Sequence, residues 1–143
     1  QVVLTHREPA QTIPSMASMA HTLWQMYSDN PDPKAAGAQW NSRMARGIRY
    51  TMQVREQHAA TRFLDIHFAD TVTQPMHVLE KVYAFANLPF TDQARAAAQV
   101  WLAQNGREKR ASHDYSLERF GLTEAQMTRD YAEYRARHLS AAR

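Results

Sequence analysis

The sequence predicts an α/β fold that is rich in helix and has two short parallel strands. An apolar, partly β-branched run at 2–4 and an alternating run at 62–68 have the patterns of strands. Longer segments with helical spacing of apolar residues follow each run. Because the first run is apolar on both faces, both runs are interpreted as members of a parallel sheet whose other strands lie outside this chain. We therefore expect part of a three-layer sheet covered by helices.

Helices are expected where start and stop signals bracket apolar stripes. The first begins at Ser15 and stops at the proline-rich turn 30–33. A second covers 35–58, and others begin at Pro75, after Thr91 as N-cap, and at 123–126, whose Thr-Glu-Ala-Gln has the form of a capping box and opens a helix to about residue 139. The side chains expected in the core are Met16, Met19 and Met26, the stripe Trp40, Met44, Ile48 and Met52, and also Trp24 and Trp101.

Length and composition limit the classes of function. The chain has 143 residues, 44% hydrophobic and 22% charged, so it is expected to be globular. A formal charge of +3 is weak for a nucleic-acid binder and suits a small anionic ligand equally well. The absence of cysteine excludes disulfides, thiolate metal sites and thiol nucleophiles.

The start of the chain has neither an initiator Met nor a signal peptide, and it begins inside an expected strand. No apolar run approaches the roughly 18–20 residues that a membrane span needs. We expect a fragment, residues 1–143 being the C-terminal part of one domain, with a cytoplasmic location and no membrane span. Sheet edges exposed by truncation would favour self-association, so a homo-oligomer is an open alternative.

The informative segment is 1–15, in which a strand leads to Arg7 and a serine follows eight residues later at the expected start of a helix. Strand ends of open α/β sheets are where ligands bind. A guanidinium presents a bidentate fork to phosphate oxygens, and a helix N-terminus presents backbone N–H groups. Arg7 and Ser15 therefore form a candidate phosphate clamp. The structural alternative is an Arg7 that pairs with Glu8 and a Ser15 that merely caps its helix.

This segment, Thr5-His6-Arg7-Glu8-Pro9 through Ile13-Pro14-Ser15, resembles the 3'-phosphate-binding segment of sulfotransferases that use the nucleotide sulfate donor PAPS. The stretch 63–89, with Gln74-Pro75 and the run Val82 to Pro89, is similar to that family's Y-E-D-L, proline and I-x-x-F-x-G-L-P unit. The tail 112–122 resembles a closing segment of its bacterial branch. The resemblance implies a P-loop-like three-layer α/β/α sulfotransferase fold, of which this chain is the C-terminal part.

Two departures from the family pattern limit what the resemblance implies. The family's phosphate loop after the first strand has no counterpart, since the four glycines, at 37, 47, 106 and 121, are scattered. The family's catalytic base also lies upstream, so catalytic residues stay unknown and the chain alone is expected to be inactive. Near the C-terminus, Arg107, Lys109 and Arg110 stand where many members have an Arg-Lys-Gly loop over the 3'-phosphate. These three are candidate donor contacts, and a solvated basic loop is the alternative.

The resemblance implies transfer of a sulfuryl group from PAPS to a hydroxyl or amine, leaving PAP. The acceptor would be a small molecule, carbohydrate or lipid, with PAPS as co-substrate and no metal.

The alternatives are half of a nucleoside or small-molecule kinase of the same fold, and a helical nucleic-acid-binding module. The second would use the stripe Arg43, Arg46, Arg49 and Arg55 with Tyr50, although an exposed helix face explains those residues better. The seven histidines lack metal-site spacing, and Asp65, His67 and Asp70 are better explained as a solvated turn, so neither a metal nor nucleic acid is expected.

Overall fold

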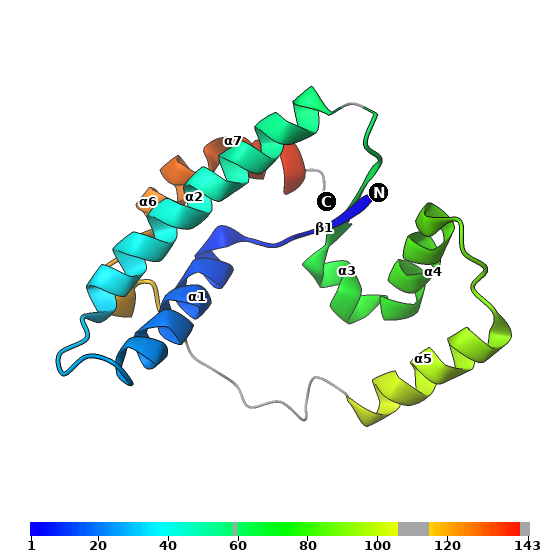
Figure 1. Ribbon diagram of the computed structural model, residues 1–143, viewed down its shortest axis with the longest axis horizontal. Coiled ribbons are helices and arrows are strands. Elements are labelled where there is room, and N and C mark those ends of the chain that lie inside the picture. Colours follow the sequence, from blue (N-terminus) through cyan, green and yellow to red (C-terminus); the bar gives the residue numbers. More distant parts are fainter. Residues whose placement is uncertain (59, 106–114, 141–143) are drawn as a thin grey trace. The chain divides into compact units, whose positions relative to one another are not determined.

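The computed structural model describes residues 1–58, 60–105 and 115–140 (Figure 1). The chain divides into two compact units. The first contains Gln1–His6 and Ala60–His113, and the second contains Arg7–Ala59 and Asp114–Arg143. The boundary between them falls directly after the first strand, so that strand and the helix that follows it belong to different units.

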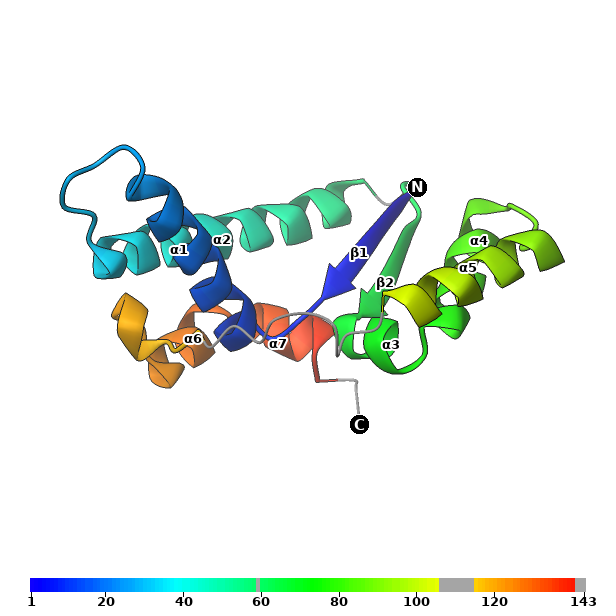
Figure 2. The same cartoon turned by 90° about the horizontal axis from the view of Figure 1, so that it is seen from below.

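The first unit is built on a parallel pair of strands, β1 (Val2–His6) and β2 (Phe63–His67). The two arrows run side by side in Figure 2, in a register that pairs Val2 with Phe63 and His6 with His67. The predicted strands and their parallel direction are confirmed. Within this chain, Val2 and Val3 of β1 are 37% and 42% exposed. In the described residues the sheet has two strands, which leaves much of both faces of β1 uncovered.

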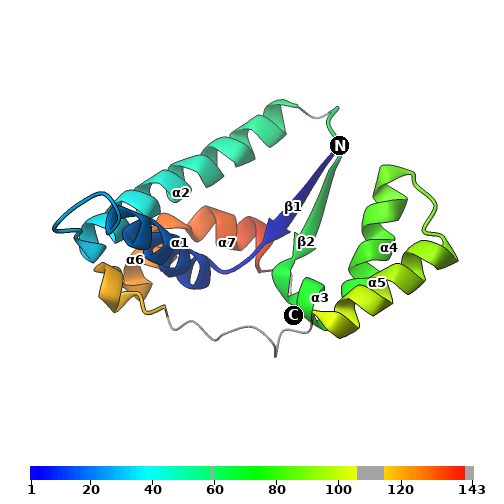
Figure 3. The ribbon, with the colours of Figure 1, turned by 60° about the horizontal axis from the view of Figure 1, so that its bottom comes forward.

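Three helices follow β2 in the first unit: α3 (Phe68–Thr73), α4 (Pro75–Ala86) and α5 (Asp92–Gln104) (Figure 3). The predicted starts at Pro75 and after Thr91 are confirmed, since the Thr91 side chain accepts a hydrogen bond from the Ala94 N–H. The short helix α3 was not predicted. Its six residues are too few to show a helical stripe in the sequence.

The end of α4 rests on a residue in the left-handed region. Asn87 has φ 58° and ψ 37°, and the Leu88 N–H donates to the Tyr83 carbonyl at 2.9 Å, as in a Schellman cap. Asparagine tolerates this conformation better than other residues with a Cβ, and glycine better still. The asparagine therefore serves where the similar family segment carries glycine.

Replacing Asn87 is expected to change stability in opposite directions depending on the residue chosen. Asn87→Gly should be neutral or stabilising by a few tenths of a kcal/mol, whereas Asn87→Ala should destabilise the protein by about 1 kcal/mol. Denaturant midpoints of both variants measure this. Equal midpoints would show that the left-handed cap does not form in solution.

The second unit is helical. It contains α1 (Pro9–Trp24), α2 (Pro33–Gln57), the short 3₁₀ turn η2 (Glu118–Phe120), α6 (Glu124–Asp130) and α7 (Ala132–His138). Helices α1 and α2 pack side by side (Figure 1). One buried cluster joins them to η2 and α6, made by Ile13, Ala17, Ala45, Phe120, Leu122, Met127 and Tyr131. This core fixes the orientation of α1 within the unit.

Two predictions about these helices are wrong. The buried face of α1 carries Ile13, Ala17 and Ala20, whereas Met16 is only half-buried, Met19 is 51% exposed, and Met26, just beyond the end of α1, is 68% exposed. Small residues at the contact let α1 and α2 approach closely, which turns the larger side chains away from it. The single C-terminal helix expected up to about residue 139 is interrupted at Tyr131, with φ −119° and ψ 16°, although its predicted N-cap Thr123 is confirmed.

Candidate functional site

Arg7 lies directly between the last residue of β1 and the start of α1. Pro9, which has no N–H to leave unpaired, begins that helix. The Arg7 Nε donates a hydrogen bond to Gln11 Oε1 at 3.2 Å, one turn into the helix.

Ser15 does not begin the helix. Ser15 stands seven residues after Glu8, the N-cap residue, in the middle of α1. Its side chain is half-buried. The prediction that backbone N–H groups of a helix N-terminus surround Ser15 is therefore wrong. The misplacement arose from Pro14, which resembles a helix stop but is accommodated inside α1. What Ser15 offers is its hydroxyl, for which no hydrogen-bond partner is seen among the described residues.

A hydrogen bond connects Arg7, which precedes α1, to the helix that carries Ser15. Gln11, which accepts the hydrogen bond from Arg7, is four residues before Ser15, and residues at this spacing lie one above the other on a helix. Gln11, which the sequence analysis did not identify, therefore links the Arg7 side chain to the part of α1 that carries Ser15. The four-residue separation between Arg7 and Gln11 in the sequence was the signal that could have identified Gln11.

The charges near the start of α1 favour an anion. The first turn of the helix contains no acidic residue, and its N-terminal end carries the positive end of the helix dipole. The Glu8 carboxylate, next to Arg7 in the sequence, forms an ion pair with Arg135 of α7, whose Nη2 lies 2.7 Å from Glu8 Oε1. The alternative in which Glu8 neutralises Arg7 is therefore not the arrangement seen. A cation and a hydroxyl in this arrangement can bind an anion.

The end of β1 is attached to β2 by a side-chain hydrogen bond. His6, 5% exposed, places Nε2 2.8 Å from Asp65 Oδ1, and its ring lies 6.2 Å from that of His67. Asp65 therefore pairs with a residue of the neighbouring strand. This corrects the sequence-based interpretation of Asp65 as part of a solvated turn. Asp70 lies in the first turn of α3.

The predicted basic residues Arg107, Lys109 and Arg110 lie outside the described residues.

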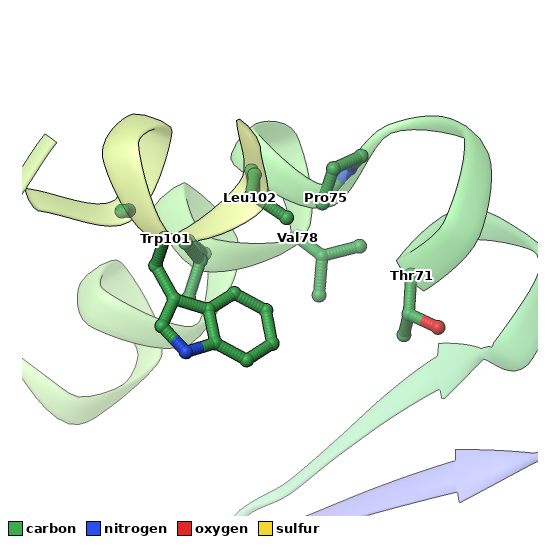
Figure 4. Close-up of a pocket in the computed structure, with 7 residues that line it drawn as sticks. Thr71, Pro75, Val78, Trp101 and Leu102 are labelled. Carbon is green, nitrogen blue, oxygen red and sulfur yellow. The ribbon is translucent and has the colours of Figure 1, made fainter. Parts of the chain in front are cut away.

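An apolar hollow of about 380 Å³ lies in the first unit beside α5. Trp101 of α5 faces it from one side, with Val78 and Pro75 of α4 opposite (Figure 4). Trp101 is 55% exposed, which corrects its expected place in the core, and the other two tryptophans are half-buried. The one hydroxyl in the lining, that of Thr71, donates to the Phe68 carbonyl at 2.7 Å. The hollow suits an apolar group and not a phosphate.

The arginine stripe of α2 is exposed at Arg43, Arg46 and Arg49 and half-buried at Arg55. Arg43 stacks over the ring of Trp40 at 5.7 Å, and Tyr50 is 66% exposed. This matches the expected exposed helix face. In the described part of the chain, no helix is long and apolar enough to cross a membrane.

Comparison with known proteins supports the resemblance seen in the sequence. The model of the sulfotransferase family matches residues 1–92, which include β1, the Arg7–Ser15 segment, β2 and α4. No curated protein matches the sequence.

Among solved structures, the fold is similar to that of sulfotransferase STF9 from Mycobacterium avium, with a TM-score of 0.72 and 23% identity. The match covers 92% of this chain and 34% of that protein, so the chain spans about a third of its length. The two-stranded, mostly helical structure is therefore a partial sulfotransferase fold. Since the family model covers more than half of its residues, the chain belongs to the sulfotransferase family.

Proposed function

We propose that this chain contributes the 3'-phosphate-binding segment of an enzyme that transfers a sulfuryl group from PAPS to a hydroxyl or amine acceptor. The single observation that supports this most is the hydrogen bond from Arg7 to Gln11, which stands one helical turn before Ser15 in α1. The 3'-phosphate is the group that distinguishes PAPS from ATP-like nucleotides. A guanidinium fork and a hydroxyl are groups suited to binding a dianion.

In the proposed reaction the acceptor oxygen or nitrogen attacks sulfur in line with the bond to the 5'-phosphate oxygen. The new S–O or S–N bond forms as the old S–O bond breaks, and PAP leaves with the electron pair while a base takes the acceptor proton. The base and the loop that holds the 5'-phosphosulfate are expected outside this chain. Arg7 and Ser15 would anchor the donor at its far end, so their contribution is to binding and orientation.

The same proposal gives Arg107, Lys109 and Arg110 the role of further cationic contacts to the donor, as the family resemblance implies. The acceptor would be a small molecule, carbohydrate or lipid. A cytoplasmic location, a homo-oligomer and the lack of nucleic-acid partners stay predictions.

Calorimetric titration of the full-length protein with PAP, 5'-AMP and ADP tests the proposal. Wild type should prefer PAP, and Arg7→Ala should weaken PAP binding by about 10- to 100-fold, the value of a charged hydrogen-bond pair, with little change for 5'-AMP. Ser15→Ala should weaken PAP binding by about 3- to 10-fold, the value of one neutral hydrogen bond.

Ser18→Ala is the matched control for Ser15→Ala. It removes a hydroxyl from the same helix, and the Ser18 group that bonds in the structure is its backbone carbonyl, which accepts from the Thr22 hydroxyl at 3.0 Å. PAP affinity should be unchanged in this variant. A wild type that binds ADP or 5'-AMP as tightly as PAP would overturn the proposal and favour a kinase. Steeply salt-dependent binding of DNA or RNA that is lost in Arg46→Ala would favour the nucleic-acid module instead.

A further inference from the structure

Glu8 stands between the phosphate-binding Arg7 and the first residue of α1, so its carboxylate is the nearest anion in the sequence to the proposed site. As N-cap residue it does not use its side chain to cap the helix; its backbone carbonyl accepts from the Gln11 and Thr12 N–H groups instead. The carboxylate atom Oε1 is buried and accepts no aligned hydrogen bond within the described residues. A buried carboxylate in this state depends on a nearby cation.

Arg135 of α7 supplies that cation. Its Nη2 lies 2.7 Å from Glu8 Oε1, and both side chains are mostly buried, at 28% and 31% exposed. Its Nη1 donates to the Thr128 hydroxyl of α6 at 2.8 Å, which fixes the plane of the guanidinium. The hydrogen bond to Thr128 therefore orients the Arg135 guanidinium, and the ion pair joins it to Glu8, which lies 127 positions earlier in the chain.

The position of this pair has a consequence for an anion at Arg7. If Arg135 were absent, the Glu8 carboxylate would be uncompensated beside the neighbouring guanidinium and would compete with a phosphate for it. It would also repel the phosphate directly, in a partly buried site where solvent screens charges less.

We propose that Arg135 is a positioning residue for the 3'-phosphate site, which acts by holding the Glu8 carboxylate away from Arg7. This inference rests on the proposed function, since it concerns the affinity of the same site. It predicts that the effect of losing Arg135 depends on Glu8 being charged, which a role of Arg135 in packing α7 does not predict.

The test is PAP and 5'-AMP titration of the full-length protein in four forms: wild type, Arg135→Met, Glu8→Gln and the double variant. Arg135→Met should weaken PAP binding about tenfold, in line with coupling between groups of one network, and change 5'-AMP binding little. Glu8→Gln alone should keep PAP affinity or raise it slightly. The double variant should return PAP affinity to within about twofold of wild type, since no carboxylate then remains to compete.

Arg137→Met is the matched control, because it removes the same charge from the same helix. Arg137 pairs with Glu56 at 2.6 Å and with Glu133 at 3.1 Å, and neither acid adjoins Arg7 in the sequence. PAP affinity should be unaffected. If Arg135→Met does not fold, Thr128→Val removes the contact that orients the guanidinium and should produce a smaller loss, again rescued by Glu8→Gln.

Arg7→Ala separates failure of the inference from failure of the proposed function. If Arg7→Ala leaves PAP selectivity intact, the 3'-phosphate site is elsewhere and both ideas fall. If Arg7→Ala abolishes selectivity while Arg135→Met preserves it, or while Glu8→Gln does not rescue the loss, the proposed function stands and the role of Arg135 is refuted.

Discussion

Replacing Gly37 by alanine is expected to destabilise the protein by about 3 kcal/mol or more, the upper range for overpacking in a core. A Cβ at this position of α2 would lie 2.0 Å from the Phe120 carbonyl oxygen and 2.8 Å from the Phe120 Cβ. The closest of these atoms belongs to the backbone of η2, and Phe120 is itself fully buried, so the clash cannot be relieved by rotating a side chain. Chemical denaturation, followed by circular dichroism, measures the loss.

Gly47→Ala in the same helix is the control. A Cβ there meets nothing within 4 Å, so the substitution should stabilise the helix by about 0.5–1 kcal/mol through the higher helix propensity of alanine. Gly37→Ala should therefore lower the free energy of unfolding, and Gly47→Ala should raise it. Equal stability of Gly37→Ala and Gly47→Ala would show that α2 and η2 do not pack as described.

Asn41→Leu is expected to destabilise the protein by about 2–4 kcal/mol, because it breaks a buried polar network. The Tyr131 hydroxyl donates to Asn41 Oδ1 at 3.0 Å, and Asn41 Nδ2 donates to Asp130 Oδ2 at 2.8 Å. Asn41 is 4% and Tyr131 2% exposed. Burial, with a smaller contribution from the Asp130 charge, raises the pKa of the Tyr131 hydroxyl, which therefore stays a donor at neutral pH. Leucine would leave that donor buried without its acceptor.

Tyr131→Phe should cost about 1 kcal/mol, since it removes the donor along with the bond, and the double variant should cost less than the sum of the two single variants. Urea titrations of the four proteins give this cycle. Strict additivity would contradict the network.

The same network makes an acid-dependent contribution to stability. Burial acts to raise the pKa of Asp130, but hydrogen bonds from Asn41 and Arg129 outweigh it, so the net pKa lies below its ordinary 3.8. A lowered folded-state pKa gives stability that is present above pH 3.8 and is lost as pH falls through the folded value. Asn41→Leu should weaken this dependence.

Local sequence was sufficient for most of the secondary structure. The strands, the caps at Thr91 and Thr123, and the start of α4 at Pro75 were predictable because each depends on residues within a few positions of one another. The sequence also contained the true start of α1, a proline at Pro9 with the required geometry. The internal Pro14 obscured it, because a proline inside a helix usually marks an end.

The candidate site was predictable only in part. Arg7 and Ser15 follow from the resemblance, and the hydrogen bond between Arg7 and Gln11 comes only from the structure. The ion pair between Glu8 and Arg135 had no sequence signal, because a surface of many charged residues allows each arginine several acidic partners.

By itself the sequence determined the family and the order and direction of the strands, and it supplied the residue types of the proposed phosphate site, since these depend on short motifs and local conformational preferences. Only the tertiary structure decided which face of α1 is buried, where Trp101 lies and which acid pairs with Arg135. It also decided that position 37 has room for glycine alone. The physical reason is that close packing and ion pairing are set by distances between residues far apart in the chain, and local patterns do not encode those distances.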